Sequence, residues 1–211
     1  MYAFKKPFLF RTVLVLTGIL LSLSVTVPSA HAAKKSWKKL YLEYLANLSE
    51  GTLENVFPEG RFIYINDDNI PELYLKGNDA ATGDRLLIIH NGKVHEWLLD
   101  GHGSLWYLEK KNRYHTSGGH MDNYFDSVGK ISKGKMQSIA SGYYGAKDNS
   151  NVKLDKNGKP VYLYCWNDKK VTKKTYQKKL NTALGKNKEK YKEAYSYGNM
   201  DTIKKIKKQL D

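Results

Sequence analysis

The chain has 211 residues and a formal net charge of +14, from 35 lysine and arginine residues against 21 aspartate and glutamate residues. Sixteen tyrosines, four tryptophans and six phenylalanines supply large apolar surfaces, which excludes a disordered chain, and one domain of ordinary size accounts for the length. Because Cys165 is the only cysteine, an internal disulfide is excluded and the fold must be held by packing.

The first 32 residues have the pattern of a secretory signal peptide. Three basic residues precede an apolar run over residues 12–27, and an A-x-A cleavage signal follows at residues 30–32. We expect cleavage before Ala33, a secreted or envelope-associated protein, and no transmembrane segment after cleavage. An uncleaved membrane anchor is the alternative, although the run is shorter than the roughly 20 residues that span a bilayer.

The next predicted element is an amphipathic helix that Ser36 caps and Gly51 ends. Its apolar residues recur at helical spacing, which indicates one face packed on a core. These residues are Trp37, Leu40, Tyr41, Tyr44, Leu45 and Leu48.

After Pro58 the pattern changes to short β-like runs broken by turn residues. The dipeptide Asn91-Gly92 between two such runs is a strong hairpin signal, and Lys133-Gly134 indicates another turn. The expected strands are 61–65, 72–76, 85–90, 93–99, 105–109, 113–116, 124–131, 137–144, 152–154 and 160–166. Short turns between successive strands favour an antiparallel meander.

Two helices are expected near the C-terminus. Thr172 caps a helix over 173–184 that Gly185 ends, and residues 200–210 form a final helix. The predicted fold is therefore α+β, an antiparallel β-meander with an N-terminal helix and one or two C-terminal helices. We expect a signal peptide (1–32), an α+β domain (33–185) and a basic C-terminal segment (186–211), in a monomer.

The positive charge of the mature chain lies near its C-terminus. Residues 33–150 carry 15 basic and 15 acidic residues, whereas residues 151–211 carry 17 lysines and six acidic residues. Such a segment attracts polyanions, and the predicted partner is an anionic cell-envelope polymer or a surface protein rather than a specific nucleic acid. The lysines singled out for polyanion binding are those of the terminal helix: Lys204, Lys205, Lys207 and Lys208. The alternatives are a solvated lysine-rich surface and a helix that packs back onto the domain.

An acidic loop lies between the first two predicted strands. Asn66, Asp68 and Glu72 offer closely spaced oxygens of the kind that Ca²⁺ requires, so they are the candidate metal ligands and Ca²⁺ is the one candidate cofactor. The alternative is a structural turn in which the side chains accept local backbone hydrogen bonds.

This loop also carries a resemblance. Residues 62–75, FIYINDDNIPELYL, resemble the D-x-D-x-D-G-I-P-E-L segment of uncharacterised exported proteins of clostridia-like Gram-positive bacteria. The runs SGGHMDNYFD, ASGYYGAKDNSNV and KNGKPVYLYCWNDKKVTKKTY resemble further parts of the same proteins. The first acidic position of the motif falls here on Tyr64, which removes one metal ligand. The resemblance implies export and no particular activity.

Five histidines lie within residues 90–120. The Asn91-Gly92 hairpin would place His90 and His95 on one face of a sheet. In a hydrolase, the acid–base residues would be His95, Glu96, His120 and Asp122. Exposed turn histidines are the alternative interpretation, since the chain has neither a recognised metal-ligand spacing nor a nucleophile elbow.

Three functions remain open from the sequence. The leading one is an exported, non-enzymatic binding or interaction protein of the cell envelope or exterior. The second is a small secreted hydrolase, nuclease-like or directed at the cell wall. The third is a calcium-stabilised structural module.

Overall fold

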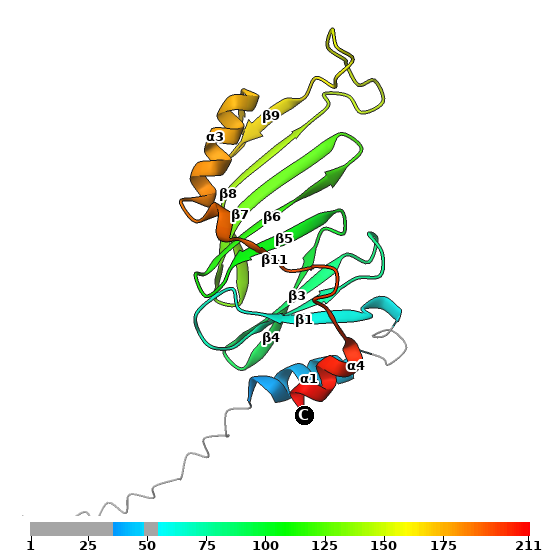
Figure 1. Ribbon diagram of the computed structural model, residues 1–211, viewed down its shortest axis with the longest axis vertical. Coiled ribbons are helices and arrows are strands. Elements are labelled where there is room, and N and C mark those ends of the chain that lie inside the picture. Colours follow the sequence, from blue (N-terminus) through cyan, green and yellow to red (C-terminus); the bar gives the residue numbers. More distant parts are fainter. Residues whose placement is uncertain (1–35, 49–54) are drawn as a thin grey trace, which may run out of the picture. The chain divides into compact units, whose positions relative to one another are not determined.

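The computed structural model describes residues 36–48 and 55–211, and these ranges form the expected α+β fold. They contain three α-helices and two antiparallel sheets, with strand orders β12-β1-β2-β3-β4 and β10-β9-β8-β7-β6-β5-β11. Strands β1 to β4 and β5 to β10 each follow one another in chain order. The succession from β5 to β9 can be followed in Figure 1. The predicted meander is therefore confirmed, as two sheets rather than one.

The first sheet contains β1 (Glu59–Ile63), β2 (Glu72–Lys76), β3 (Asp84–His90), β4 (Lys93–Leu99) and β12 (Asp201–Thr202). The second contains β5 (Gly103–Leu108), β6 (Arg113–His120), β7 (Asn123–Ser132), β8 (Lys135–Gly145), β9 (Leu163–Trp166), β10 (Lys169–Val171) and β11 (Lys192–Glu193). The helices are α1 (Trp37–Asn47), α3 (Lys173–Leu184) and α4 (Ile203–Leu210), with a short 3₁₀ turn, η1 (Lys188–Lys190).

The predicted hairpin turns are confirmed. Asn91 and Gly92 both have positive φ, as a two-residue hairpin turn requires, and Lys133 and Gly134 repeat this geometry. The register pairs Ile88 with His95 and His90 with Lys93, which places His90 and His95 on one face of the sheet, as the sequence predicts.

Strand β6 is longer than the sequence predicts, because two glycines continue it. Gly118 pairs with Gly103 of β5, and a Cβ at Gly118 would lie only 2.4 Å from the Gly103 Cα. The glycines therefore allow close backbone pairing between β5 and β6 beyond the predicted end of the strand at residue 116. The predicted strand 152–154 is reduced to one bridge between Leu154 and Pro160.

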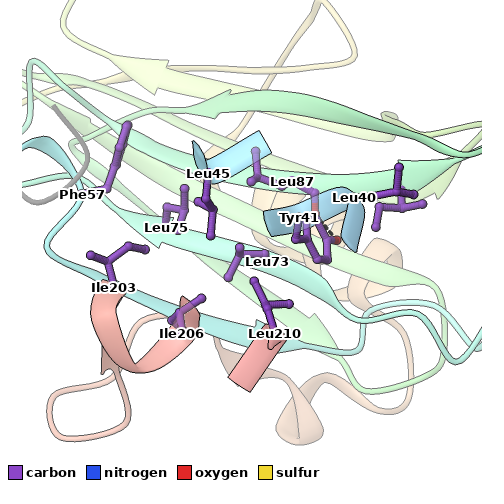
Figure 2. Packing of buried hydrophobic residues seen from close by; sticks show 11 residues of the cluster. Leu40, Tyr41, Leu45, Phe57, Leu73, Leu75, Leu87, Ile203, Ile206 and Leu210 are labelled. Carbon is purple, nitrogen blue, oxygen red and sulfur yellow. Dashed lines mark hydrogen bonds between the residues drawn. The ribbon is translucent and has the colours of Figure 1, made fainter. Parts of the chain in front are cut away.

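The first sheet has a core on each face. On one face, α1 and α4 pack side by side against β2 and β3 (Figure 1, Figure 2). The labelled side chains of this core in Figure 2 are Leu40, Tyr41, Leu45, Phe57, Leu73, Leu75, Leu87, Ile203, Ile206 and Leu210. On the other face, alternate residues of β1, β2 and β3 meet β5, β6 and the end of β7. The first sheet is therefore a middle layer between helices and the second sheet.

Residues 186–211, the predicted basic C-terminal segment, pair and pack with both sheets. Strand β11 pairs with β5 in the second sheet, and β12 pairs with β1 in the first. Ile206 of α4 is fully buried against the first sheet. The segment thus contributes to both sheets and to the helical layer.

Residues 1–35 and 49–54 lie outside the described ranges. The predicted signal peptide and the predicted helix stop at Gly51 fall there. Helix α1 begins after Ser36, whose hydroxyl accepts a hydrogen bond from the Lys39 backbone N–H, and its last helical residue is Asn47.

Candidate functional site

Helix α3 forms on the signals that the sequence shows. The Thr172 hydroxyl accepts a hydrogen bond from the Thr175 N–H, which satisfies one of the unpaired donors at the helix start. Gly185, with φ of 78°, donates its N–H to the Asn181 carbonyl and ends the helix. Tyr176 is the only residue of α3 that is fully buried, so most of the helix surface is accessible.

Tyr176 attaches α3 to the second sheet through a buried carboxylate. Its hydroxyl donates to Asp126 Oδ2 at 2.6 Å, and Asp126 Oδ1 lies 2.8 Å from His115 Nε2. Burial, followed by the hydrogen bond to Asp126, raises the pKa of Tyr176 well above its ordinary value, which keeps the phenol protonated as the donor. The ring of Trp106 stacks on His115 with centroids 5.2 Å apart. Residues of α3, β5, β6 and β7 are thus joined by one chain of contacts.

Aromatic rings surround this attachment. Tyr176 packs edge-on against Trp166 of β9, at 5.3 Å and 89° between the ring planes, and also meets Tyr144 and Tyr164. The approach depends on Gly142 of β8, where a Cβ would lie 2.5 Å from the Tyr176 ring. The helix is therefore held close to β8 and β9, the position that it takes in Figure 1.

The accessible side of this region is strongly basic. Residues 169–188 contain eight lysines and no acidic residue. Six exposed lysines of β10 and α3 form what is called here the α3 lysine surface: Lys169, Lys170, Lys173, Lys174, Lys178 and Lys179. In the described ranges, none of these six forms an ion pair. The positive charge is therefore available to a ligand.

A hollow of about 620 Å³, the α3 groove, runs along one side of the helix. Five helical residues at i, i+3, i+4, i+7 and i+8 form one wall, which is the spacing of a single helix face. The lining residues are Thr175, Lys178, Lys179, Thr182 and Ala183 of α3 with Ala140 of β8 and Trp166 of β9. Two lysines of the α3 lysine surface thus line a concave site.

A second open hollow of about 650 Å³ lies by the β6–β7 turn and the facing ends of β8 and β9. Its floor includes a row of side chains across three paired strands, Phe125, Tyr143 and Cys165. His120, Asp100 and Lys147 are among its charged or titratable lining residues, so its charges are mixed in sign.

The three predicted metal ligands lie close together but accept local hydrogen bonds. Glu72 is buried and accepts from the Ile65 N–H at 2.8 Å and from the Asn66 side chain at 2.9 Å. Asn66 Oδ1 accepts from the Asp68 N–H, and Asp68 Oδ1 from the Ile70 N–H. Burial raises the pKa of Glu72 to about 8, with a smaller contribution from the charge of Asp68. These local hydrogen bonds are the ones that the structural-turn interpretation expects, and the Ca²⁺ site stays a prediction.

The four residues proposed for acid–base chemistry have separate environments. His95 and Glu96 are neighbours on β4 and so point to opposite faces. His95 lies under the β7–β8 turn near Gly134, whereas Glu96 pairs with Arg85 at 2.6 Å and accepts from Tyr44. 

The other two residues lie at the β6–β7 turn. The His120 ring lies beside His102, with centroids 4.0 Å apart, and Asp122 accepts from the Tyr162 hydroxyl at 2.5 Å. Neither contact includes His95 or Glu96. The histidine that does contact a buried carboxylate is His115, which the sequence does not distinguish from its neighbours.

The lysines of α4 are arranged differently from those of α3. Helix α4 packs onto the first sheet through Ile203, Ile206 and Leu210, as in the alternative of a helix that packs back onto the domain. Lys205 pairs with Asp201 at 2.5 Å, and Lys207 is partly buried, whereas Lys204 and Lys208 are exposed. One of the four predicted polyanion-binding lysines therefore already has a carboxylate partner.

The sequence alone does not predict the α3 groove. Its one signal is the run 169–188, which has lysines and no acidic residue but lies within the lysine excess of the whole C-terminal region. The groove also needs Ala140 and Trp166, which come from strands that only the fold places beside α3. 

Comparison of the chain with known protein families, with curated proteins and with solved structures finds no match. No helix within residues 36–48 and 55–211 has the length and apolar character needed to cross a membrane.

Proposed function

We propose that this protein is an exported, non-enzymatic binding protein that attaches to an anionic polymer of the cell envelope through the α3 lysine surface. The observation that carries the proposal is the set of six exposed lysines that have no carboxylate partner in the described ranges. Clustered positive charge attracts polyanions and increases their association rate. Export rests on the signal-peptide pattern of residues 1–32.

The placement of two of these lysines supports a binding role over a purely structural one. Lys173 and Lys174 lie in the first turn of α3, where no acidic residue is present. A helix N-terminus carries a partial positive charge, so cations there destabilise a helix by about 0.3–1 kcal/mol each. Lys173 and Lys174 therefore do not stabilise the helix, but they do increase the positive potential of the surface that would bind a polyanion.

The proposal is tested by two variants that remove equal charge from different helices. In the first, Lys173, Lys174, Lys178 and Lys179 of α3 are replaced by Gln. In the second, Lys204, Lys205, Lys207 and Lys208 of α4 are replaced by Gln. The protein used is the expected mature chain, residues 33–211, called here the mature protein. It and both variants are incubated with isolated Gram-positive cell envelopes over a series of NaCl concentrations, and the bound fraction is measured.

We expect the mature protein to bind at low salt and to be released at high salt, since exposed charges are screened. The α3 variant should lose most of this binding, and the α4 variant should retain most of it. Equal loss in both variants would show that net charge alone causes retention. No retention of the mature protein at low salt would contradict the proposed function.

A further inference from the structure

The α3 groove differs from the rest of the α3 lysine surface in shape and lining. Lys178 and Lys179 line it, whereas Lys173 and Lys174, on the same helix, do not. The groove is also lined by Ala140 of β8 and by Ala183 and two threonines of α3. A ligand in the groove would therefore meet cationic side chains, hydroxyl groups and small apolar side chains within one concave site of about 620 Å³.

The groove offers no open aromatic face. Trp166 is its only aromatic lining residue, it is 5% exposed, and its ring packs edge-on against Tyr176. Proteins that bind single-stranded nucleic acids combine a basic groove with aromatic side chains on which the bases stack. The groove has the charge for such a ligand but lacks the stacking surface.

We infer that the α3 groove binds the backbone of a phosphodiester-linked polyol polymer, a chain of phosphates joined by short hydroxylated carbon units. Lys178 and Lys179 pair with successive phosphates, because an ammonium group and a phosphate oxygen form a charge-assisted hydrogen bond. The Thr175 hydroxyl accepts from Thr172 and keeps its own proton to donate to a polyol or phosphate oxygen. The carbon units pack on Ala140 and Ala183. This inference rests on the proposed function and names the ligand class of the same helix.

The test uses synthetic poly(glycerol phosphate) as the probe and compares charge-matched variants of the mature protein. Lys178→Ala with Lys179→Ala removes the groove lysines, and Lys173→Ala with Lys174→Ala removes two lysines outside the groove. A third variant, Ala183→Trp, places a large side chain in the groove and leaves the charge unchanged. Circular dichroism and thermal melting establish that each variant folds, and calorimetry at fixed salt measures the Kd.

We expect the groove pair to weaken binding by roughly tenfold or more, and the outer pair by roughly threefold or less. Ala183→Trp should weaken binding about as much as the groove pair. A single-stranded oligodeoxynucleotide with the same number of phosphates should bind more weakly than poly(glycerol phosphate) and should be affected equally by the two lysine pairs.

Three results would overturn the inference. Equal losses from the two lysine pairs would mean that binding is diffuse, which leaves the proposed function intact. Equal or tighter binding of the oligodeoxynucleotide, with the same dependence on Lys178 and Lys179, would assign the groove to nucleic acid. If poly(glycerol phosphate) does not bind while cell envelopes still retain the protein, the proposed function stands and the ligand class is wrong.

Discussion

At the scale of single residues, Glu72 shows how burial determines the chemistry of the acidic loop. Glu72 is 2% exposed, and its carboxyl group accepts two hydrogen bonds from within the loop. With a pKa of about 8, against an ordinary value of 4.5, the folded protein keeps this group protonated over a pH range in which the unfolded chain ionises it.

The stability of the protein should therefore decrease as pH rises from about 4.5 to about 8, because unfolding releases the Glu72 proton in that range. Each pKa unit corresponds to about 1.4 kcal/mol, so the contribution of Glu72 is measurable. Glu72→Gln keeps a carbonyl acceptor for the Ile65 N–H and removes the titration. We expect urea unfolding at pH 5, 6.5 and 8 to show a flatter pH dependence for this variant. Parallel curves for the two proteins would contradict the pKa assigned to Glu72.

Gly142 is the residue on which the close packing of α3 depends most directly. An added Cβ would lie 2.5 Å from the Tyr176 ring and 2.6 Å from the Trp166 ring, and both rings are buried. Gly142→Ala should therefore destabilise the protein by about 1–3 kcal/mol, the usual cost of overpacking. Ser141→Ala, at the preceding position on β8, is the control; its side chain is exposed, and the change should alter stability by less than about 0.5 kcal/mol. Equal unfolding midpoints in urea for the two variants would show that β8 and α3 can move apart.

At the scale of elements, the structure separates what stabilises α3 from what its surface can bind. Buried contacts of Tyr176 with Asp126 and Trp166 hold the helix, while its exposed lysines contribute charge. The lysines can therefore be changed without disturbing the attachment.

Reversing the two lysines of the first turn tests this separation. Acidic residues at a helix N-terminus are stabilising, so Lys173→Glu with Lys174→Glu should raise stability by about 0.5–2 kcal/mol. The same variant should bind anionic envelopes more weakly, because four units of positive charge are lost. Thermal melting and envelope retention, measured on one preparation, check both effects. If the variant is more stable and binds as well as the original chain, Lys173 and Lys174 do not contribute to envelope binding.

Local signals in the sequence were sufficient to predict many of these elements. Helix caps and tight turns depend on residues that are close together in the chain. The structure contains the predicted caps at Ser36 and Thr172 and the predicted turn at Asn91-Gly92. The extension of β6 could not be predicted, because it depends on Gly118 meeting Gly103 of another strand. The α3 groove cannot be predicted for the same reason, since its walls come from β8, β9 and α3.

At the scale of the whole molecule, the C-terminal residues belong to the core. Ile203, Ile206 and Leu210 are each at most 2% exposed and pack with α1 on the first sheet. A chain ending at Leu184 would lose these side chains together with β11 and β12. We expect that truncated chain to lack a cooperative thermal transition, because deleting even one large buried side chain costs about 2–5 kcal/mol. A cooperative transition near that of the intact protein would show that the C-terminal elements are dispensable for folding.

Charge is also organised over the whole molecule. The described residues up to Ser150 are close to electrical balance, and the lysine excess follows in the strands and helices after β8. Much of that excess lies on two helices. The exposed lysines of α3 have no carboxylate partner in the described ranges, whereas Lys205 of α4 pairs with Asp201. The central claim is that the α3 lysine surface binds a polyanion.

The most direct test of that claim is the salt dependence of binding. Log K for poly(glycerol phosphate) is measured against log salt concentration for the mature protein and for the variant with Lys173, Lys174, Lys178 and Lys179 replaced by Gln. Each phosphate neutralised by a lysine releases condensed counterions and steepens the slope. We predict a steep negative slope for the mature protein and a clearly shallower slope with weaker binding for the variant. Identical slopes and affinities for the two proteins would contradict the claim that the α3 lysine surface binds the polymer.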